Sequence, residues 1–238
     1  MQTPPSPPKP VAEFWKPELT HLPRLHLARG FFRAFARGVC RTVISVCTRV
    51  DTKGLENFPR TGPALVVINH LGDTDAPLLV GFVPAVLDAL GKIELYDFPL
   101  LGKLMDWYGI IWLHRGQPDR RAIRAALDGL AEGRVIVIAP EGRYSLTGEL
   151  EEATDGAAFL ALKANVPVVP VALIGTENVN IYGHLRRLRR PLVKLKGGQP
   201  FVLAEQAGCQ QDALREGTRQ IMFALASLLP VEYRGIYK

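Results

Sequence analysis

The sequence predicts an α/β fold, in which one domain holds a mixed, largely parallel sheet flanked by helices and follows an N-terminal amphipathic helical segment. Short apolar runs alternate with segments of helical pattern, and this alternation is typical of a largely parallel sheet. The chain has 238 residues, 47% of them hydrophobic, which is enough to bury one core. Its net charge of +6 comes from residues 1–60, where ten Lys and Arg face four Asp and Glu.

The first fifty residues (1–50) predict a disordered, proline-rich tail and then a basic, membrane-docking helix from about Leu22 to Thr48. Arginines recur every four residues and share an arc about 120° wide; they are Arg29, Arg33, Arg37 and Arg41. The other side of the helix is aromatic and aliphatic, with Phe31, Phe32, Phe35, Val39, Val43 and Val46. We interpret the arginines as contacts to an anionic membrane surface and the phenylalanines as groups that insert below it. The alternative is a helix packed on the core with a solvated arginine face.

Residues 51–238 predict the second and larger unit, which opens with a linker at 51–63. Apolar runs predict strands at 64–69, 109–114, 134–140, 166–175 and 191–198. Helical patterns begin at about Asp75 or Pro77 and cover 117–133, 153–164 and 210–229, whereas 91–109 reads as irregular. Pro167 and Pro170 favour an edge strand or a strand start, because proline cannot donate to a central ladder.

The sequence also predicts where the protein works. No run approaches the roughly 18 apolar residues of a spanning helix, and no secretory signal is visible. Cys40, Cys47 and Cys209 have neither metal-binding nor disulfide spacing, as in proteins of a reducing compartment. We therefore expect a cytoplasmic protein, peripheral on the inner face of the cell membrane.

A histidine and an aspartate follow the strand at 64–69. His70 is five residues from Asp75, and the turn between them brings the carboxylate back to the imidazole. A carboxylate on one ring nitrogen fixes the tautomer and leaves the other nitrogen to accept a proton. The sequence lacks a GxSxG serine elbow. The pattern therefore favours a general base that acts on a hydroxyl brought by the substrate, although a structural His–Asp pair has the same spacing.

Charged residues follow two further strands. Arg115 ends the run at 109–114, and Glu141, Gly142 and Arg143 follow the run at 134–140. Carboxyl ends of parallel strands are where α/β proteins bind ligands. Glycine permits a close backbone approach, and a guanidinium suits phosphate. These residues are candidates for substrate binding, and a surface charge or a turn with a salt bridge is the alternative for each.

Together these segments resemble the 1-acylglycerol-3-phosphate acyltransferase family, the PlsC-like lysophospholipid acyltransferases. Four blocks occur in the family's order, as Asn69-His70 with Asp75, GIIWLHR ending at Arg115, APEGRYS at 139–145 and VPVVPV at 166–171. The resemblance covers about residues 50–235. It implies a glycerolipid acyltransferase domain (51–238), in which His70 is the general base and Asp75 orients it. Arg115, Glu141, Gly142 and Arg143 would hold the glycerol phosphate.

The implied reaction transfers a fatty acyl group from acyl-CoA or acyl carrier protein to lysophosphatidic acid, which gives phosphatidic acid without an acyl-enzyme. No cofactor is expected beyond this acyl donor. The third block departs from the common FPEGTRS, since Arg143 replaces threonine and Tyr144 replaces arginine. This departure leaves open a different lysophospholipid or hydroxyl acceptor, or a transacylase. Asp73, inside the first block, is expected to cap the following helix.

Two other classes of function compete with an acyltransferase. A metal-dependent phosphohydrolase would use His70, Asp73 and Asp75 as ligands, but the other histidines show no ligand spacing. A basic module that binds membranes or nucleic acid would use the arginines of 184–191, but no nucleic-acid motif accompanies that run. We therefore expect no metal and no nucleic-acid partner. The acyl-chain length, the oxyanion donors and the oligomeric state have no local signature.

Overall fold

A seven-stranded sheet forms the centre of the molecule. The structure is a computed structural model that describes residues 11–12, 15–59, 62–116, 119–204 and 210–238. The strands are β1 (Arg49–Lys53), β2 (Ala64–Ile68), β3 (Leu87–Lys92), β4 (Ile111–Leu113), β5 (Val135–Ile138), β6 (Val168–Ile174) and β7 (Leu192–Gly197). Their order is β1-β7-β6-β2-β5-β3-β4, and every neighbouring pair is parallel except β6 and β7. The predicted α/β fold with a mixed, largely parallel sheet is confirmed.

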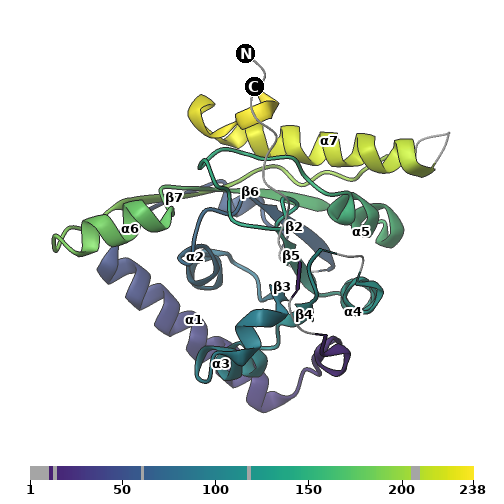
Figure 1. Cartoon of the computed structure of the whole chain (residues 1–238), viewed down its shortest axis with the longest axis horizontal. Helices are drawn as coiled ribbons and strands as arrows, with labels where there is room; N and C mark the ends of the chain where they lie inside the picture. The colour runs from purple at the N-terminus through teal and green to yellow at the C-terminus, as the bar shows by residue number, and fades with distance from the viewer. Residues whose placement is uncertain (1–10, 13–14, 60–61, 117–118, 205–209) are drawn as a thin grey trace.

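Helices cover both faces of this sheet (Figure 1). They are α1 (Leu27–Cys47), α2 (Asp75–Phe82), α3 (Leu101–Tyr108), α4 (Arg120–Ala131), α5 (Gly156–Ala164), α6 (Asn178–Leu185) and α7 (Gln210–Leu228). Short 3-10 helices lie at Pro17–Leu19, Leu55–Asn57, Ile93–Asp97, Val231–Tyr233 and Gly235–Tyr237. In Figure 1, α1, α2 and α3 lie on one side of the sheet, and α4, α5 and α7 lie on the other.

Alternate side chains of β2 point to opposite faces of the sheet, which explains why helices cover both faces. All five residues of β2 are buried. Ala64, Val66 and Ile68 contribute to the core on the side of α1 and α2. Leu65 and Val67 contribute to the core on the side of α4 and α5. Because successive side chains of a strand point to opposite faces, a continuous apolar run is what a strand covered on both faces requires.

Helix α1 packs with its arginine face toward the body of the protein. Arg33 is buried and forms an ion pair with Asp88 of β3, and its Nε donates to the carbonyl oxygen of Tyr108. The side chains of Arg29 and Arg37 are half-buried and donate to backbone carbonyls, those of Trp107 and Ala85 respectively. The prediction that Arg33 contacts headgroups is therefore wrong, because a buried carboxylate and the end of α3 bind this guanidinium.

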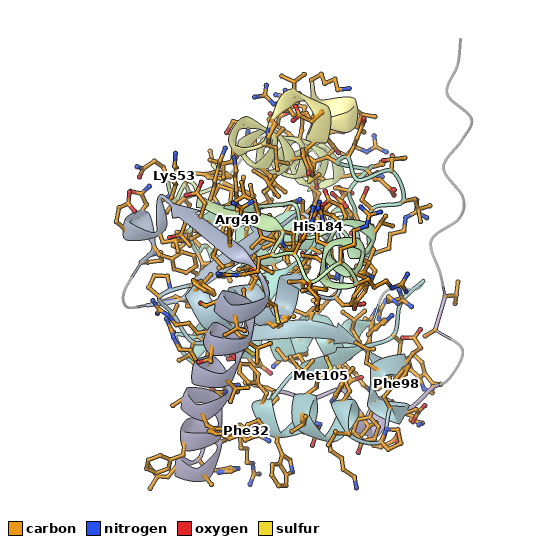
Figure 2. The ribbon with its side chains drawn as sticks, turned by 90° about the vertical axis from the view of Figure 1, so that its left-hand side faces the viewer. Phe32, Arg49, Lys53, Phe98, Met105 and His184 are labelled. Atoms are coloured by element: carbon orange, nitrogen blue, oxygen red, sulfur yellow. The ribbon has the colours of Figure 1, made fainter. Side chains whose placement is uncertain are left out.

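The apolar face of α1 points outward instead. It consists of exposed side chains of Leu27, Phe31, Phe35, Val39, Val43 and Val46. Phe31 is 75% exposed and Phe35 is 67% exposed, while Phe32 is half-buried and packs edge-on against Trp107. Figure 2 shows α1 running along the front of the molecule, with Phe32 near one end and Arg49 beyond the other. Arg41 is exposed and lies over the ring of Phe82.

Several elements differ from those expected. Part of the predicted linker forms β1, which pairs with β7. The segment read as irregular contains α3, and the sequence pattern gave no sign of β3 or α6. Pro170 lies within β6, which is a central strand, so its assignment to an edge is wrong. Gly198 lies against the pyrrolidine ring of Pro170 and donates its N–H to the Pro170 carbonyl oxygen. Because Gly198 has no side chain, it does not collide with that ring.

Among the described residues, no helix has the length and apolar character needed to cross a bilayer. Cys40 and Cys47 are free thiols. The predicted proline-rich tail (3–10) and Cys209 lie outside the described residues.

Candidate active site

The imidazole of His70 and the carboxylate of Asp75 form a hydrogen-bonded pair. His70 follows β2, and Asp75 begins α2, so the turn between strand and helix sets their separation. The Nδ1 atom of His70 lies 2.7 Å from Oδ2 of Asp75. The backbone N–H groups of Leu71 and Gly72 donate to the same oxygen, at 2.7 and 3.0 Å. Three donors therefore hold the Asp75 carboxylate in one orientation.

The two partners differ in exposure, and this difference suits a base. The side chain of Asp75 is fully buried, whereas that of His70 is 27% exposed. With Asp75 accepting the Nδ1 proton, the lone pair of the imidazole belongs to Nε2, which is free to accept a proton from a bound hydroxyl. Asn69 anchors the strand end, because its amide exchanges two hydrogen bonds of 2.8 Å with the backbone of Leu173 in β6.

The loop after β5 reaches the same edge of the sheet. The N–H of Ser145 donates to the carbonyl oxygen of His70 at 2.8 Å, which ties the third sequence block to the first. Gly142 has φ +71°, a conformation that favours glycine, and the space where a Cβ would stand is open. Glu141 is buried. Arg143 is also buried, and its guanidinium binds the carboxylate of Glu151 at 2.6 Å.

Arg115 follows β4 and is the most distant of the predicted binding residues. Neighbouring strands are about 4.8 Å apart, so the end of β4 lies about 14 Å from the end of β2 across the intervening β3 and β5. The side chain of Arg115 is largely buried and pairs with Glu94 at 3.1 Å. Both predicted phosphate-binding arginines are thus held by carboxylates.

Lys92 is a candidate site residue that the sequence pattern did not indicate. It ends β3, the strand between those of Arg143 and Arg115, and its ammonium lies 5.8 Å from the centre of the Tyr144 ring. No ion pair involving Lys92 forms within the described part of the chain. A lysine at a strand end is the signal that would have found it, but the sequence pattern did not predict β3.

Tyr144 is the second missed residue, and it corrects the assignment of Asp73. The Tyr144 ring meets the His70 ring edge-on, with centres 4.2 Å apart, and its hydroxyl donates to Asp73 at 3.0 Å. Burial, and next the hydrogen bond to Asp73, raise the pKa of Tyr144 above its ordinary value. Asp73 does not cap α2, whose N-cap is Thr74 without a side-chain hydrogen bond. Its second oxygen instead accepts from Tyr182 of α6 at 3.0 Å.

A second His–Asp pair has the same spacing but different surroundings. His114 and Asp119 are 2.8 Å apart, and both are buried. The N–H of Lys16 donates to Nε2 of His114 at 2.9 Å, which occupies the nitrogen that a base would need. His114 therefore fastens the N-terminal segment to the body. No group of three or more potential metal ligands gathers among the residues that the structure covers.

Comparison with known proteins agrees with this geometry. A family model described as Acyltransferase matches residues 49–174, more than half of the chain. The chain belongs to this acyltransferase family. The match covers all four sequence blocks and therefore includes all six predicted catalytic and substrate-binding residues.

Two proteins named as acyltransferases are similar to part of the chain. It is 29% identical over 134 residues to a chloroplastic 1-acyl-sn-glycerol-3-phosphate acyltransferase of Brassica napus, a match that covers 55% of this chain and 39% of the relative. It is 39% identical over 112 residues to a lyso-ornithine lipid O-acyltransferase of Pseudomonas aeruginosa, which covers 47% and 43% of the two chains. The matched region thus spans less than half the length of each of these two relatives.

A solved member of the acyltransferase family has the same fold. The crystal structure of the 1-acyl-sn-glycerophosphate acyltransferase PlsC from Thermotoga maritima superposes with a TM-score of 0.67 and 25% sequence identity. The superposition covers 84% of this chain and 79% of PlsC.

Proposed function

We propose that this chain transfers a fatty acyl group from an acyl thioester to the free hydroxyl of a lysophospholipid such as lysophosphatidic acid. The observation that carries the proposal is the His70–Asp75 pair, a buried carboxylate holding a partly exposed imidazole. Membership of the acyltransferase family and the names of its relatives support the same chemistry. The donor is acyl-CoA or acyl carrier protein, because either presents the acyl group as a thioester.

In the proposed reaction, Nε2 of His70 removes the proton from the acceptor hydroxyl, and the oxygen of that hydroxyl attacks the carbonyl carbon of the thioester. The carbon–sulfur bond then breaks, and the thiolate leaves with the proton that His70 returns. Asp75 stabilises the imidazolium that exists between these two proton transfers. The acyl group passes directly to the acceptor, so the mechanism contains no acyl-enzyme and needs no serine or cysteine nucleophile.

The cation best available to an acceptor phosphate is Lys92. Arg143 and Arg115 are engaged with Glu151 and Glu94, so binding a phosphate with either of them requires sharing or exchanging a carboxylate. Lys92 has only the Tyr144 ring beneath its ammonium in the described contacts. We therefore assign the first contact with phosphate to Lys92. The edge of the site around Lys92 is formed by Glu141, Gly142, Arg143 and Arg115.

The proposed membrane surface combines the apolar face of α1 with side chains near α3. Exposed apolar residues of the second group are Phe98, Leu100, Leu101, Leu104 and Trp107. Figure 2 shows Met105 on the side of the half of α1 that carries Phe32, with Phe98 farther from this helix. Exposed apolar area of this extent on adjoining helices is typical of a surface that binds a partner or a membrane.

Basic residues border this surface at the other end of α1. Arg186, Arg187 and Arg189 are exposed in the loop after α6, and none of them forms an ion pair within the described residues. Arg190 fixes the loop to α1, because its guanidinium donates to the carbonyl oxygens of Ser45 and Thr48. This basic loop (186–189), and not the arginine face of α1, supplies the cations for anionic headgroups.

The experiment that tests the proposed function supplies the purified protein with anionic vesicles, labelled acyl-CoA and lysophosphatidic acid. We expect labelled phosphatidic acid to form in proportion to the amount of protein. A parallel assay uses the acyl thioester of acyl carrier protein as the donor. Transfer of label to water alone would identify a thioesterase and contradict the proposal. A second reading, acylation of another lysolipid, is favoured by the two arginines already paired with carboxylates, and the same assay with other lysolipids tests it.

A further inference from the structure

An exposed carboxylate stands beside the proposed base. Asp73 lies in the loop between β2 and α2, three residues after His70. The hydroxyls of Tyr144 and Tyr182 donate to its two oxygens, each at 3.0 Å, and its own N–H donates to Asn178 at 2.9 Å. Two chain segments, the loop after β5 and helix α6, therefore hold Asp73 in position while its side chain stays open to solvent.

Asp73 is one tyrosine ring away from the reacting centre. The Tyr144 ring touches the His70 ring edge-on, with centres 4.2 Å apart, while its hydroxyl binds the carboxylate. The Tyr144 ring thus borders the imidazole that receives the acceptor hydroxyl. The groups that border Tyr144 are therefore within reach of a headgroup attached next to that hydroxyl.

The charges on the two sides of Tyr144 are opposite. Lys92 lies over the ring on one side, and Asp73 binds the hydroxyl at the ring's end. The two tyrosine hydroxyls are neutral, so they orient the carboxylate without cancelling its charge. Asp73 forms no ion pair with any residue in the described ranges. The site thus offers one cation and one anion that the protein leaves available.

A carboxylate held by two tyrosine hydroxyls is a favourable environment for an ammonium group. The carboxylate supplies a charge-assisted hydrogen bond to the cation. Each Asp73 oxygen accepts one tyrosine hydroxyl, which leaves a further acceptor position on each. A purely anionic headgroup would be repelled at the same position.

We propose that the acceptor is a lysolipid with an ammonium-bearing headgroup, whose cation binds Asp73 between Tyr144 and Tyr182 while its phosphate binds Lys92. The inference rests on the proposed function, since it concerns the acceptor of the same reaction. It selects a zwitterionic acceptor over lysophosphatidic acid, which carries no cation. Tyr144 also explains the altered third block, because an arginine at this position would neutralise Asp73 and remove the ammonium site.

The test compares three acceptors with one acyl chain, presented in the same mixed micelles: lysophosphatidylethanolamine, lysophosphatidylglycerol and lysophosphatidic acid. The first two are both phosphodiesters and differ in having an ammonium or hydroxyl groups at the end of the headgroup. For the unaltered protein, we expect kcat/KM with the ethanolamine lipid to exceed that with the glycerol lipid about tenfold or more, the range of one charge-assisted hydrogen bond. This comparison needs no variant to fold.

Variants then assign the preference to Asp73. Asp73→Asn keeps the shape of the side chain, with its oxygen accepting from one tyrosine hydroxyl and its amide donating to the oxygen of the other. It should lower kcat/KM for the ethanolamine lipid about tenfold and leave that for the glycerol lipid unchanged. Asp212→Asn, an equal change of charge on α7, should alter neither value. Transfer to the glycerol and ethanolamine lipids at equal rates, unaffected by Asp73→Asn, would overturn the ammonium site but leave the acyltransfer reaction standing. Transfer to none of the three would overturn the proposed function, and this inference with it.

Discussion

Arg33 and Asp88 form an ion pair beneath α1 in which both side chains are almost fully buried, with 6% and 2% of their surface exposed. Arg134 lies on the other side of the same carboxylate, at 3.7 Å. The pair joins a helix from the N-terminal segment to β3, the strand that ends at Lys92. Helix α1 is therefore fixed to the strand that carries the proposed phosphate contact.

Removing one member of this pair should destabilise the fold. Arg33→Ala leaves the buried Asp88 with less compensation, and we expect the free energy of unfolding to fall by about 3–5 kcal/mol. Urea denaturation measures the change. Arg41→Ala is the control, because this arginine of the same helix is exposed and its loss should change stability by about 0.5 kcal/mol or less. Equal effects of the two substitutions would contradict the buried pair.

The exposed apolar face of α1 predicts binding without a contribution to stability. The double variant Phe31→Ser with Phe35→Ser should lose sedimentation with anionic vesicles while its melting temperature stays unchanged, because both rings already face solvent. Phe223→Ser on α7 is the matched control, and should retain vesicle binding. A sharp fall in melting temperature for the double variant would instead mean that this face packs on protein.

The contribution of charge to vesicle binding is tested on the basic loop (186–189). Changing Arg186, Arg187 and Arg189 to Glu should weaken binding to anionic vesicles about 100-fold or more, since each lost basic residue contributes about 1 kcal/mol near such a surface. The effect should shrink at high salt. Unchanged binding to anionic vesicles would show that these arginines face away from the membrane.

Lys92 predicts a defect confined to the acceptor. Lys92→Ala should raise the apparent KM for a phosphate-bearing lysolipid about tenfold or more, because a charge-assisted hydrogen bond contributes about 1.5–3 kcal/mol. The KM for the acyl donor should stay near its original value. Lys103→Ala, at an exposed position of α3, should change neither constant. An equal rise in both constants for Lys92→Ala would indicate that this lysine binds the donor or supports the structure.

Tyr108 predicts a loss of stability in alkali. Burial raises its pKa to about 12, although Arg33 opposes the shift. The unfolded tyrosine ionises near pH 10, so the contribution of Tyr108 is complete below pH 10 and is lost as pH rises toward 12. The stability difference between the unaltered protein and Tyr108→Phe should therefore fall by about 1 kcal/mol from pH 9 to pH 11. A constant difference in urea denaturation would contradict the raised pKa.

Sequence patterns predicted the fold well where they are local. The continuous apolar runs of β2, β5 and β6 and the amphipathic pattern of α7 need no knowledge of neighbours. The sequence did not predict the strand β3 because its apolar pattern is weak, with Gly91 inside it and Pro84 shortly before it. The residues of β3 are buried by strands that come later in the chain. With β3 unknown, the sequence offered no reason to select Lys92.

Partners distant in sequence explain the remaining differences. The arc of arginines on α1 is visible in the sequence, but its direction depends on Asp88, 55 residues later. Likewise, His70 with Asp75 and His114 with Asp119 have the same spacing. Only the fold exposes the first imidazole and covers the second with the backbone of Lys16.

The role of His70 as general base is tested by the rate at which the His70→Ala variant transfers an acyl group to lysolipid. This rate is compared with that of the unaltered protein, after equal melting temperatures have shown that both are folded. We expect a loss of about 10²–10⁴-fold, the usual contribution of a general base, and a comparable loss for Asp75→Asn. His184→Ala, at an exposed histidine, should keep full activity. A His70→Ala protein that retained more than about a tenth of the original rate would contradict the assignment of His70 as the base.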